Sequence, residues 1–304
     1  MRAAALALIA GLAAGSARAQ VPIGDVGSLL KQAREGASFM PAAAGGVDNP
    51  WKRVRKPSRG PAESIGSYSA GCIRGAEALP WSGPGYEVMH VSRARYFGHP
   101  RLVAFLRGLG AGAAGFGTVL IGDLGMPRGG PTLTGHASHQ SGLDVDVWFR
   151  MLSPGSTVSD QDRERLGSPE MVVPDFERLN SLWDPRVIDM LALSASQPEV
   201  ERIFVNPVVK REACLRRRGE AWLSKLRPWW GHDDHFHVRL KCAPGDARCS
   251  VQEPVPDGDG CGAELASWFT PERKAEARRQ RTEPGEPPTM PRLPAACAAV
   301  LSEQ

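Results

Sequence analysis

Three of the seven histidines in this chain fall within six positions, at His232, His235 and His237. Polar and apolar side chains alternate from 235 to 240, which is the period of a half-buried strand. On such a strand His235, His237 and Arg239 share one face, while the apolar residues between them point into the core. The segment therefore predicts a strand that presents two neighbouring imidazoles, an arrangement that suits a metal ion.

A second segment, Gly135–Trp148, supplies further candidate ligands. Apolar residues alternate from 143 to 149, so this stretch is also predicted to be a strand. A loop that folds back over the start of this strand would bring His139 close to Asp146. Catalytic zinc sites take three protein ligands and leave one position for water. With His237 from an adjacent strand, the sequence predicts such a site, with two histidines and one carboxylate.

Hydrolysis at such a site also needs a proton acceptor. The His-Glu-x-x-His motif of many metalloproteases is absent, so a glutamate on a helix is not available for this role. His235 shares a face with His237 and is the first candidate for the catalytic base. His232 is the second candidate, as a base or as a donor to a developing oxyanion. Three aspartates are candidates to orient the imidazoles by hydrogen bonds: Asp144, Asp233 and Asp234.

Other histidines and tryptophans carry weaker signals. His90 and His99 are each isolated, and we interpret them as hydrogen-bonded core residues. The tryptophans near the two segments are predicted to pack in the core or at the rim, with substrate binding as the alternative. These are Trp148, Trp229 and Trp230.

The N-terminus has the pattern of a secretory signal. Met1-Arg2 precedes an apolar run from Ala3 to Ala14, and Ala17-Arg18-Ala19 offers small residues to a signal peptidase. We predict a signal peptide over residues 1–19. A membrane anchor, the alternative, needs about 20 apolar residues. No membrane span is therefore expected in the mature chain, which begins with an irregular arm over residues 20–63.

Six cysteines are spread from Cys72 to Cys297. An even number in an exported chain predicts three disulfides, and the short spacing of Cys242 and Cys249 makes them natural partners. A structural zinc site is the alternative, but no Cys-x-x-Cys pair is present. The wide spread of the cysteines favours one domain wrapped by its own ends.

Length, composition and net charge indicate a self-sufficient core and argue against nucleic-acid binding. With 304 residues, of which 42% are hydrophobic, the chain can bury a sizeable core without a metal. The formal charge of +4 falls by two when Arg2 and Arg18 leave with the signal, so nucleic acid is not an expected partner. Further predicted elements are strands at 118–121 and 201–205 and helices at 100–109, 184–193, 208–217, 220–227 and 271–281.

The chain resembles the penicillin-insensitive murein endopeptidases, a branch of the zinc peptidases that includes lysostaphin, the D-Ala-D-Ala peptidases and the hedgehog domain. The superfamily signature, His-x(6)-Asp followed by His-x-His, corresponds to His139, Asp146 and His235-Phe236-His237. The narrower resemblance covers most of the chain from Ser64 to Cys261. It rests on four stretches: 95–100, 117–123, 135–146 and 229–240.

The resemblance implies an α+β fold, in which a single domain has a central antiparallel sheet flanked by helices and long loops. Residues 64–304 would form a zinc metallopeptidase domain with a disulfide-tethered C-terminal tail. The implied activity is hydrolysis of the D-alanyl–meso-diaminopimelyl cross-bridge of peptidoglycan in the periplasm. Implied zinc ligands are His139, Asp146 and His237, and His235 would be catalytic with His232 nearby. The implied disulfides are Cys72–Cys297, Cys214–Cys261 and Cys242–Cys249.

Some members of that family bind a second zinc at a dimer contact, through a histidine that corresponds to His136. The resemblance therefore implies a second metal site and a possible homodimer. Two other functions are compatible with the same residues. One is a D,D-carboxypeptidase or dipeptidase of the superfamily, and the other is a cell-wall binding module that keeps zinc without catalysis. Peptide-stem carboxylates would bind Arg239 or basic residues elsewhere.

Overall fold

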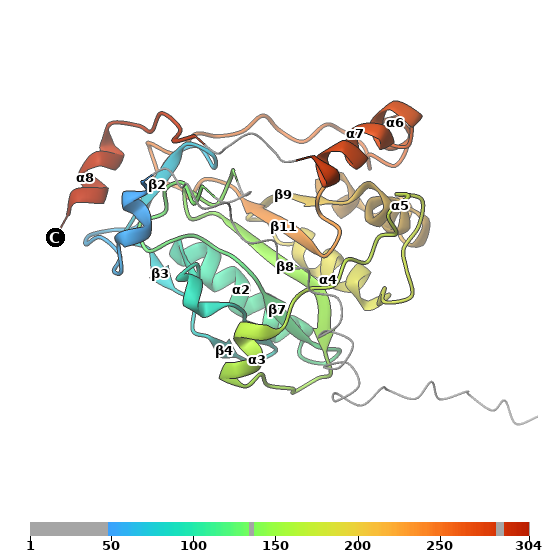
Figure 1. Ribbon diagram of the computed structural model, residues 1–304, viewed down its shortest axis with the longest axis horizontal. Coiled ribbons are helices and arrows are strands. Elements are labelled where there is room, and N and C mark those ends of the chain that lie inside the picture. The colour runs from blue at the N-terminus through green and yellow to red at the C-terminus, as the bar shows by residue number, and fades with distance from the viewer. Residues whose placement is uncertain (1–47, 134–136, 284–288, 304) are drawn as a thin grey trace, which may run out of the picture. The chain divides into compact units, whose positions relative to one another are not determined.

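A seven-stranded sheet runs through the fold and contains every segment that the sequence predicts as a strand (Figure 1). The computed structural model describes residues 48–133, 137–283 and 289–303. In spatial order the sheet consists of β10 (Leu226–Pro228), β9 (Val200–Val205), β11 (His235–Leu240), β8 (Asp144–Leu152), β7 (Thr118–Ile121), β5 (Tyr86–Val88) and β4 (Ser82–Gly83). Its central strands are antiparallel, whereas β10 pairs with β9 and β5 with β7 in parallel.

Helices and two small sheets complete the fold. The helices are α2 (Pro100–Ala113), α3 (Asp160–Arg165), α4 (Arg186–Ala195), α5 (Pro207–Arg216), α6 (Ala263–Ser267), α7 (Pro271–Thr282) and α8 (Ala296–Ser302). Short 3₁₀ helices lie at Pro50–Arg53, Val91–Arg93 and Ala221–Lys225. The small sheets pair β1 (Glu63–Gly66) with β2 (Gly71–Arg74) and β3 (Glu77–Ala78) with β6 (Phe97–Gly98). The predicted α+β class is confirmed. No helix among the described residues is long and apolar enough to cross a membrane.

The apolar side chains of β8 and β11 anchor the main core. Val145, Val147, Phe236 and Val238 are fully buried and belong to one cluster with the apolar stripes of α2 and α4. Because side chains alternate across a strand, this packing directs the residues between them to the opposite face of the sheet. Core packing therefore fixes which face of the sheet carries the predicted metal ligands.

Two helical predictions differ from the structure. Helix α2 does not end at Gly110 but continues to Ala113. A Cβ at Gly110 would lie 2.7 Å from both the carbonyl oxygen of Pro84 and the ring of Tyr86, so this glycine serves close packing rather than termination. The predicted helix at 220–227 is instead a 3₁₀ turn followed by β10, whose parallel pairing with β9 overrides the local helical pattern.

Both ends of the described chain pack onto the same region. Trp51, Cys72, Cys297 and Val300 belong to a second buried cluster. The guanidinium of Arg128 donates hydrogen bonds of 2.9 Å to the carbonyls of Val300 and Leu301. The structure contains the three expected disulfides: Cys72–Cys297, Cys214–Cys261 and Cys242–Cys249. The tail predicted to be held by Cys297 is thus anchored, and it forms α8 there.

Two predicted N-terminal segments, the signal peptide and the irregular arm, fall mostly on residues that the structure does not describe. The predicted signal peptide and most of the predicted arm lie outside the described residues, and the boundary at residue 64 stays a prediction. Arm residues from 48 onward contact the fold, because the side-chain amide of Asn49 donates a 2.7 Å hydrogen bond to the carbonyl of Pro131.

The sizes of the disulfide loops predict unequal contributions to stability. Cys72 and Cys297 are 225 residues apart, whereas Cys242 and Cys249 are seven apart. Loop-closure entropy then predicts that Cys72→Ser/Cys297→Ser lowers the unfolding free energy by about 5 kcal/mol and Cys242→Ser/Cys249→Ser by about 2–3 kcal/mol. Urea unfolding of both double variants measures the difference. Equal losses would show that chain entropy does not govern these bonds.

Candidate metal centre

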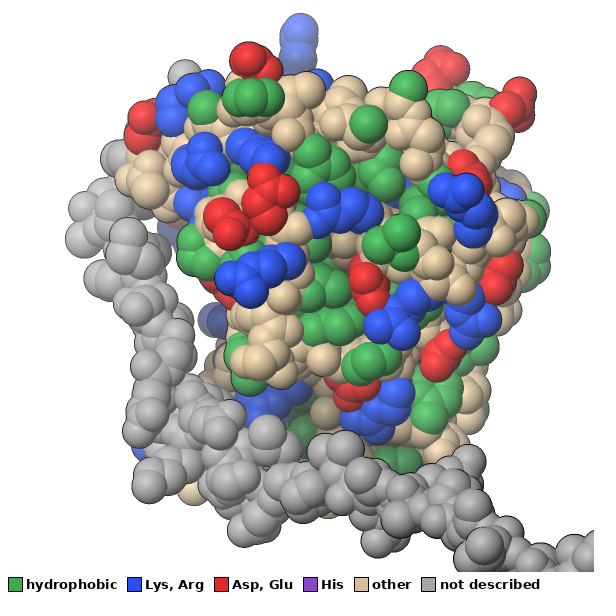
Figure 2. Space-filling model, turned by 90° about the vertical axis from the view of Figure 1, so that its right-hand side faces the viewer, with side chains coloured by type: hydrophobic (Ala, Val, Ile, Leu, Met, Phe, Trp, Pro, Cys, Tyr) green, Lys and Arg blue, Asp and Glu red, His purple; other side chains and the backbone are tan. Residues whose placement is uncertain are grey.

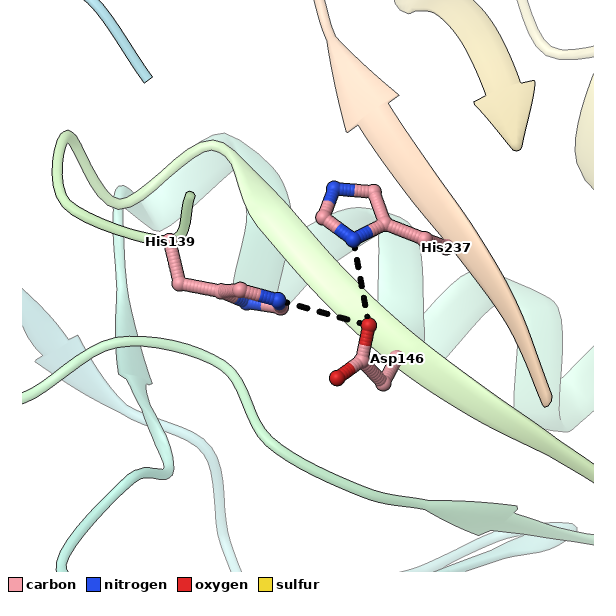
Figure 3. A group of neighbouring side chains, drawn as sticks. All are labelled: His139, Asp146 and His237. Atoms are coloured by element: carbon pink, nitrogen blue, oxygen red, sulfur yellow. Dashed lines mark ion pairs between the residues drawn. The ribbon is translucent and has the colours of Figure 1, made fainter. Parts of the chain in front are cut away.

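Three side chains from two strands and a loop converge on one point (Figure 3). The Nε2 atom of His139 lies 3.3 Å from Oδ1 of Asp146, and the Nδ1 atom of His237 lies 3.2 Å from the same oxygen. One ligand atom from each residue lies within 4.8 Å of the others, and all three residues are buried. The structure therefore brings together the three residues that the sequence predicts as ligands.

Strand register explains how two of them meet. Strands β8 and β11 are antiparallel, and Asp146 stands directly opposite His237. Opposed residues of such a pair have Cβ atoms only about 5 Å apart. His139 reaches the same point from the loop before β8, with a positive φ of 68°. That conformation is rare outside glycine and is held by the surrounding contacts, because the His139 amide donates a 3.1 Å hydrogen bond to Asp144.

Asp144 holds two of the ligands in place through hydrogen bonds to the ring of His237 and the amide of His139. It is fully buried, and its Oδ1 accepts hydrogen bonds from Nε2 of His237 at 2.9 Å and from Nε of Arg239 at 2.7 Å. Burial alone would raise the pKa of Asp144, but Arg239 and His237 hold it well below its usual range. An ionised carboxylate accepts a hydrogen bond from Nε2–H, which leaves Nδ1 of His237 as the ring nitrogen with a free electron pair for a metal.

Arg239 is part of this support. Its guanidinium lies 4.0 Å from the ring centroid of Tyr68 and 5.0 Å from that of Phe204, and the residue is only 7% exposed. The bond to Asp144 and this aromatic packing hold Arg239 inside the protein. It is therefore not accessible to the carboxylate of a large substrate, in contrast to the first expectation from the sequence.

The two predicted catalytic histidines lie beside the ligands. Nε2 of His235 is 3.6 Å from Oδ1 of Asp146, and its Nδ1 forms a 2.6 Å hydrogen bond with Asp234. The His232 ring lies 5.0 Å from that of His235, and its Nδ1 is 3.2 Å from the carbonyl oxygen of Trp230. A carbonyl only accepts, so Nδ1 of His232 donates there and Nε2 is left as an acceptor.

The electrostatic environment shifts the pKa values of these two imidazoles in opposite directions. Burial lowers the pKa of His235, but Asp146 and Asp234 outweigh it and raise the pKa to about 9. Burial and the neighbouring His235 hold the pKa of His232 well below its usual value. A cation bound to Asp146 would neutralise the main charge that raises the pKa of His235, and this imidazole could then accept a proton near neutral pH.

The donor set fits a small divalent cation. Ligand atoms about 2.0–2.1 Å from a tetrahedral zinc ion lie about 3.3 Å from one another. The two spacings measured to Oδ1 of Asp146, 3.3 and 3.2 Å, match this value. Imidazole and carboxylate ligands suit zinc, although they also accept other divalent ions.

Four further residues singled out in the sequence are His136, His99, His90 and Asp233. His136 lies outside the described residues. His99 caps α2, where its Nδ1 accepts a 3.1 Å hydrogen bond from the amide of Arg101. His90 packs against Trp148, with ring centroids 5.5 Å apart. Asp233 bonds to the side chains of Asn206 and Arg281 rather than to an imidazole.

Exposure separates the three tryptophans. Trp148 and Trp230 are each 7% exposed, whereas Trp229 is 56% exposed. Trp229 packs edge-on against Phe204, with ring centroids 5.9 Å apart. Of the three, only Trp229 offers a broad aromatic surface to solvent.

Two residues around the centre were missed by the sequence reasoning. The carbonyl oxygen of Asp123 accepts a 2.9 Å hydrogen bond from the Asp146 amide, and Phe204 stands opposite His237 in the sheet. Phe204 carries no chemical signal of its own in the sequence. Asp123 ends one of the stretches that carry the family resemblance, and its place two residues after a buried strand could have identified it.

A buried pair of imidazoles and a carboxylate, next to a further imidazole able to carry a proton, could hold a metal ion and is an arrangement typical of metallohydrolases. Comparison with known proteins narrows this class. A profile of the penicillin-insensitive murein endopeptidases matches residues 64–302. The penicillin-insensitive murein endopeptidase of Klebsiella pneumoniae (strain ATCC 700721 / MGH 78578) is 45% identical over 267 residues, which cover 86% of this chain and 94% of that protein.

The protein of the same name from Escherichia coli (strain K12) is 41% identical over 270 residues. That alignment covers 88% of this chain and 96% of the relative. The chain therefore belongs to the penicillin-insensitive murein endopeptidase family, and it is a peptidase.

Replacement of the supporting carboxylate tests the geometry of the centre. We expect Asp144→Asn to weaken zinc binding by about 10–100-fold, because an amide does not stabilise the required form of His237 as a carboxylate does. Competition with a chromogenic chelator measures the affinity. Asp160→Asn is the matched control, because the side chain of Asp160 is 94% exposed. Unchanged zinc affinity in a folded Asp144→Asn protein would show that Asp144 does not tune the ligands.

Proposed function

We propose that this protein is a zinc-dependent murein endopeptidase that hydrolyses the D-alanyl–meso-diaminopimelyl amide cross-bridge of peptidoglycan. The observation that carries the proposal is the convergence of His139, Asp146 and His237 beside His235. Relatives of 41–45% identity that are named murein endopeptidases support the substrate class. The bond between D-alanine and diaminopimelate is the cross-bridge that the family resemblance implies.

His139, Asp146 and His237 would hold the zinc ion. When bound, it supplies acidification of water to a pKa of about 7 and polarisation of the amide carbonyl. His235 would accept at Nε2 the proton that the attacking water loses, because its Nδ1 is committed to Asp234. The same proton can then pass from His235 to the amine that leaves the cross-bridge. Because no serine is acylated in this chemistry, β-lactams should not inhibit the protein.

His232 has a supporting role in this proposal. Its Nδ1 donates to the carbonyl of Trp230, so the ring presents Nε2 as an acceptor while it stays neutral. In that state Nε2 can accept a proton, but more weakly than His235 because burial lowers the pKa of His232, whereas stabilisation of an oxyanion would require the ring to be protonated at Nε2. Of the two roles expected from the sequence, this contact favours the base.

We further propose that the protein acts in the periplasm after removal of residues 1–19. Three disulfides support an oxidising compartment, which the predicted signal peptide would give access to. The second metal site through His136 and the homodimer stay predictions, because His136 lies outside the described residues.

Two histidine variants should separate metal binding from turnover. We expect His237→Ala to lose zinc, and His235→Ala to keep zinc while kcat on a cross-linked muropeptide dimer falls by about 10²–10⁴-fold. Metal analysis and chromatography of the released monomers provide the two measurements. His99→Asn preserves a helix-capping residue outside the centre and should retain both zinc and turnover. A zinc-loaded wild-type protein that leaves dimers intact would refute the enzymatic proposal and favour a binding module.

The identity of the products should separate the two peptidase functions. An endopeptidase converts cross-linked dimers into monomers and does so only without chelator. A D,D-carboxypeptidase or dipeptidase would release single D-alanine or a dipeptide and leave the cross-links. Mass spectrometry of wild-type digests decides between them, and free D-alanine without monomers would overturn the endopeptidase proposal.

A further inference from the structure

A basic hollow of about 280 Å³ lies between the chain at residues 52–55, the segment 93–95 and the loop that follows β7. Four cationic side chains line it: Lys52, Arg55, Arg93 and Arg95. Its remaining wall consists of Val54, Ala94, Met126 and Pro127. The hollow therefore combines positive charge with an apolar surface, and no residue of the proposed catalytic set belongs to it.

Asp123 connects this hollow to the metal centre. Its carboxylate accepts a 2.7 Å hydrogen bond from Arg95 and lies 3.6 Å from the guanidinium of Arg93. Its carbonyl oxygen accepts the hydrogen bond from the amide of Asp146. The arginines of the hollow are thus one residue away from a proposed metal ligand.

The opposite wall of the hollow also approaches the centre. A Cβ added at Gly125 would lie 3.0 Å from the carbonyl oxygen of His139, so the chain that continues into Met126 and Pro127 runs beside this ligand. Two separate connections, through Asp123 and through Gly125, therefore join the lining of the hollow to the backbone of two proposed metal ligands, Asp146 and His139.

The hollow has more positive charge than its own carboxylate offsets. Asp123 faces two of the four cations, whereas the ion pairs among the described residues include neither Lys52 nor Arg55. Both of these residues are exposed. The face that carries α5, α6 and α7 is different, because its Lys and Arg side chains are interspersed with Asp and Glu (Figure 2). The hollow is thus able to bind an anion.

We propose that this hollow binds a free carboxylate of the peptide stem next to the cross-bridge. The inference rests on the proposed function, because it assigns a subsite to the same substrate. Guanidinium groups bind carboxylates through paired N–H donors, and the apolar wall reduces the competition from water. The carboxylate is held at one side of the metal centre, which directs the scissile amide toward His139, Asp146 and His237.

This assignment gives the stem carboxylates the binding site that the buried Arg239 does not provide. A carboxylate site in the hollow should select among peptide stems by their charge. Stems with free carboxylates bind more tightly than stems in which these groups are amidated, because amidation removes the charge without changing the shape greatly. Lys52 and Arg55 act on substrate binding and not on the chemical step.

The test uses wild-type protein and three single variants on cross-linked muropeptide dimers with free or amidated stem carboxylates. Lys52→Ala and Arg55→Ala should each raise KM for the free-carboxylate dimer by about fivefold and leave kcat unchanged, as expected for one partly exposed ion pair. Wild-type KM should be higher for the amidated dimer, and the two variants should have little further effect on it. Arg53→Ala is the matched control, because Arg53 lies in the same 3₁₀ helix as Lys52, pairs with Asp48 and does not line the hollow.

A binding measurement separates failure of this inference from failure of the proposed function. Calorimetric titration of an uncleaved monomeric stem tetrapeptide should show about fivefold weaker binding to Arg55→Ala than to the wild type or Arg53→Ala. If the wild type hydrolyses dimers but KM and stem binding are the same in every variant, the carboxylate subsite is refuted and the endopeptidase stands. If stem binding depends on Arg55 but no dimer is cleaved, the subsite stands and the endopeptidase fails.

Discussion

The antiparallel pairing of β8 with β11 is the constraint on which the metal centre depends. It sets Asp146 opposite His237, and two strand residues away it sets Asp144 where it bonds to Arg239 and to the Nε2 atom of His237. A shift of one residue would move both carboxylates to the apolar face and strip the core of its valines. Burial of that core and alignment of the ligands are therefore the same structural event.

The features of the site that the sequence predicts are those that depend on the alternation within these two strands. The period of two in both strands is visible in the sequence and predicts that Asp146, His235 and His237 lie on the face opposite the apolar residues, where the structure has them. The position of His139 was predicted, but the left-handed backbone that holds it arises from loop contacts. The bond between Asp144 and Arg239 spans 95 residues, and no local pattern in the sequence encodes such a partner.

Residues that meet across strands form a row with the metal centre in its middle. Phe204 stands opposite His237, which stands opposite Asp146, whose amide bonds to Asp123. Beyond Phe204 lies the exposed ring of Trp229, and beyond Asp123 lie the arginines of the basic hollow. The two ends of the row thus differ in chemistry, because one is aromatic and the other is cationic.

The bond between Cys72 and Cys297 joins points 225 residues apart, and it cannot close until that whole length of chain has been synthesised. Cys72 lies in β2, where the amide of the next residue, Ile73, bonds to the carbonyl of Arg128 in the loop that leads toward His139. The loop that leads toward His139 is thus supported by β2, and the disulfide of β2 can form only after Cys297 has been synthesised. Any chain that ends before Cys297 therefore lacks the covalent link between this strand and the C-terminal tail.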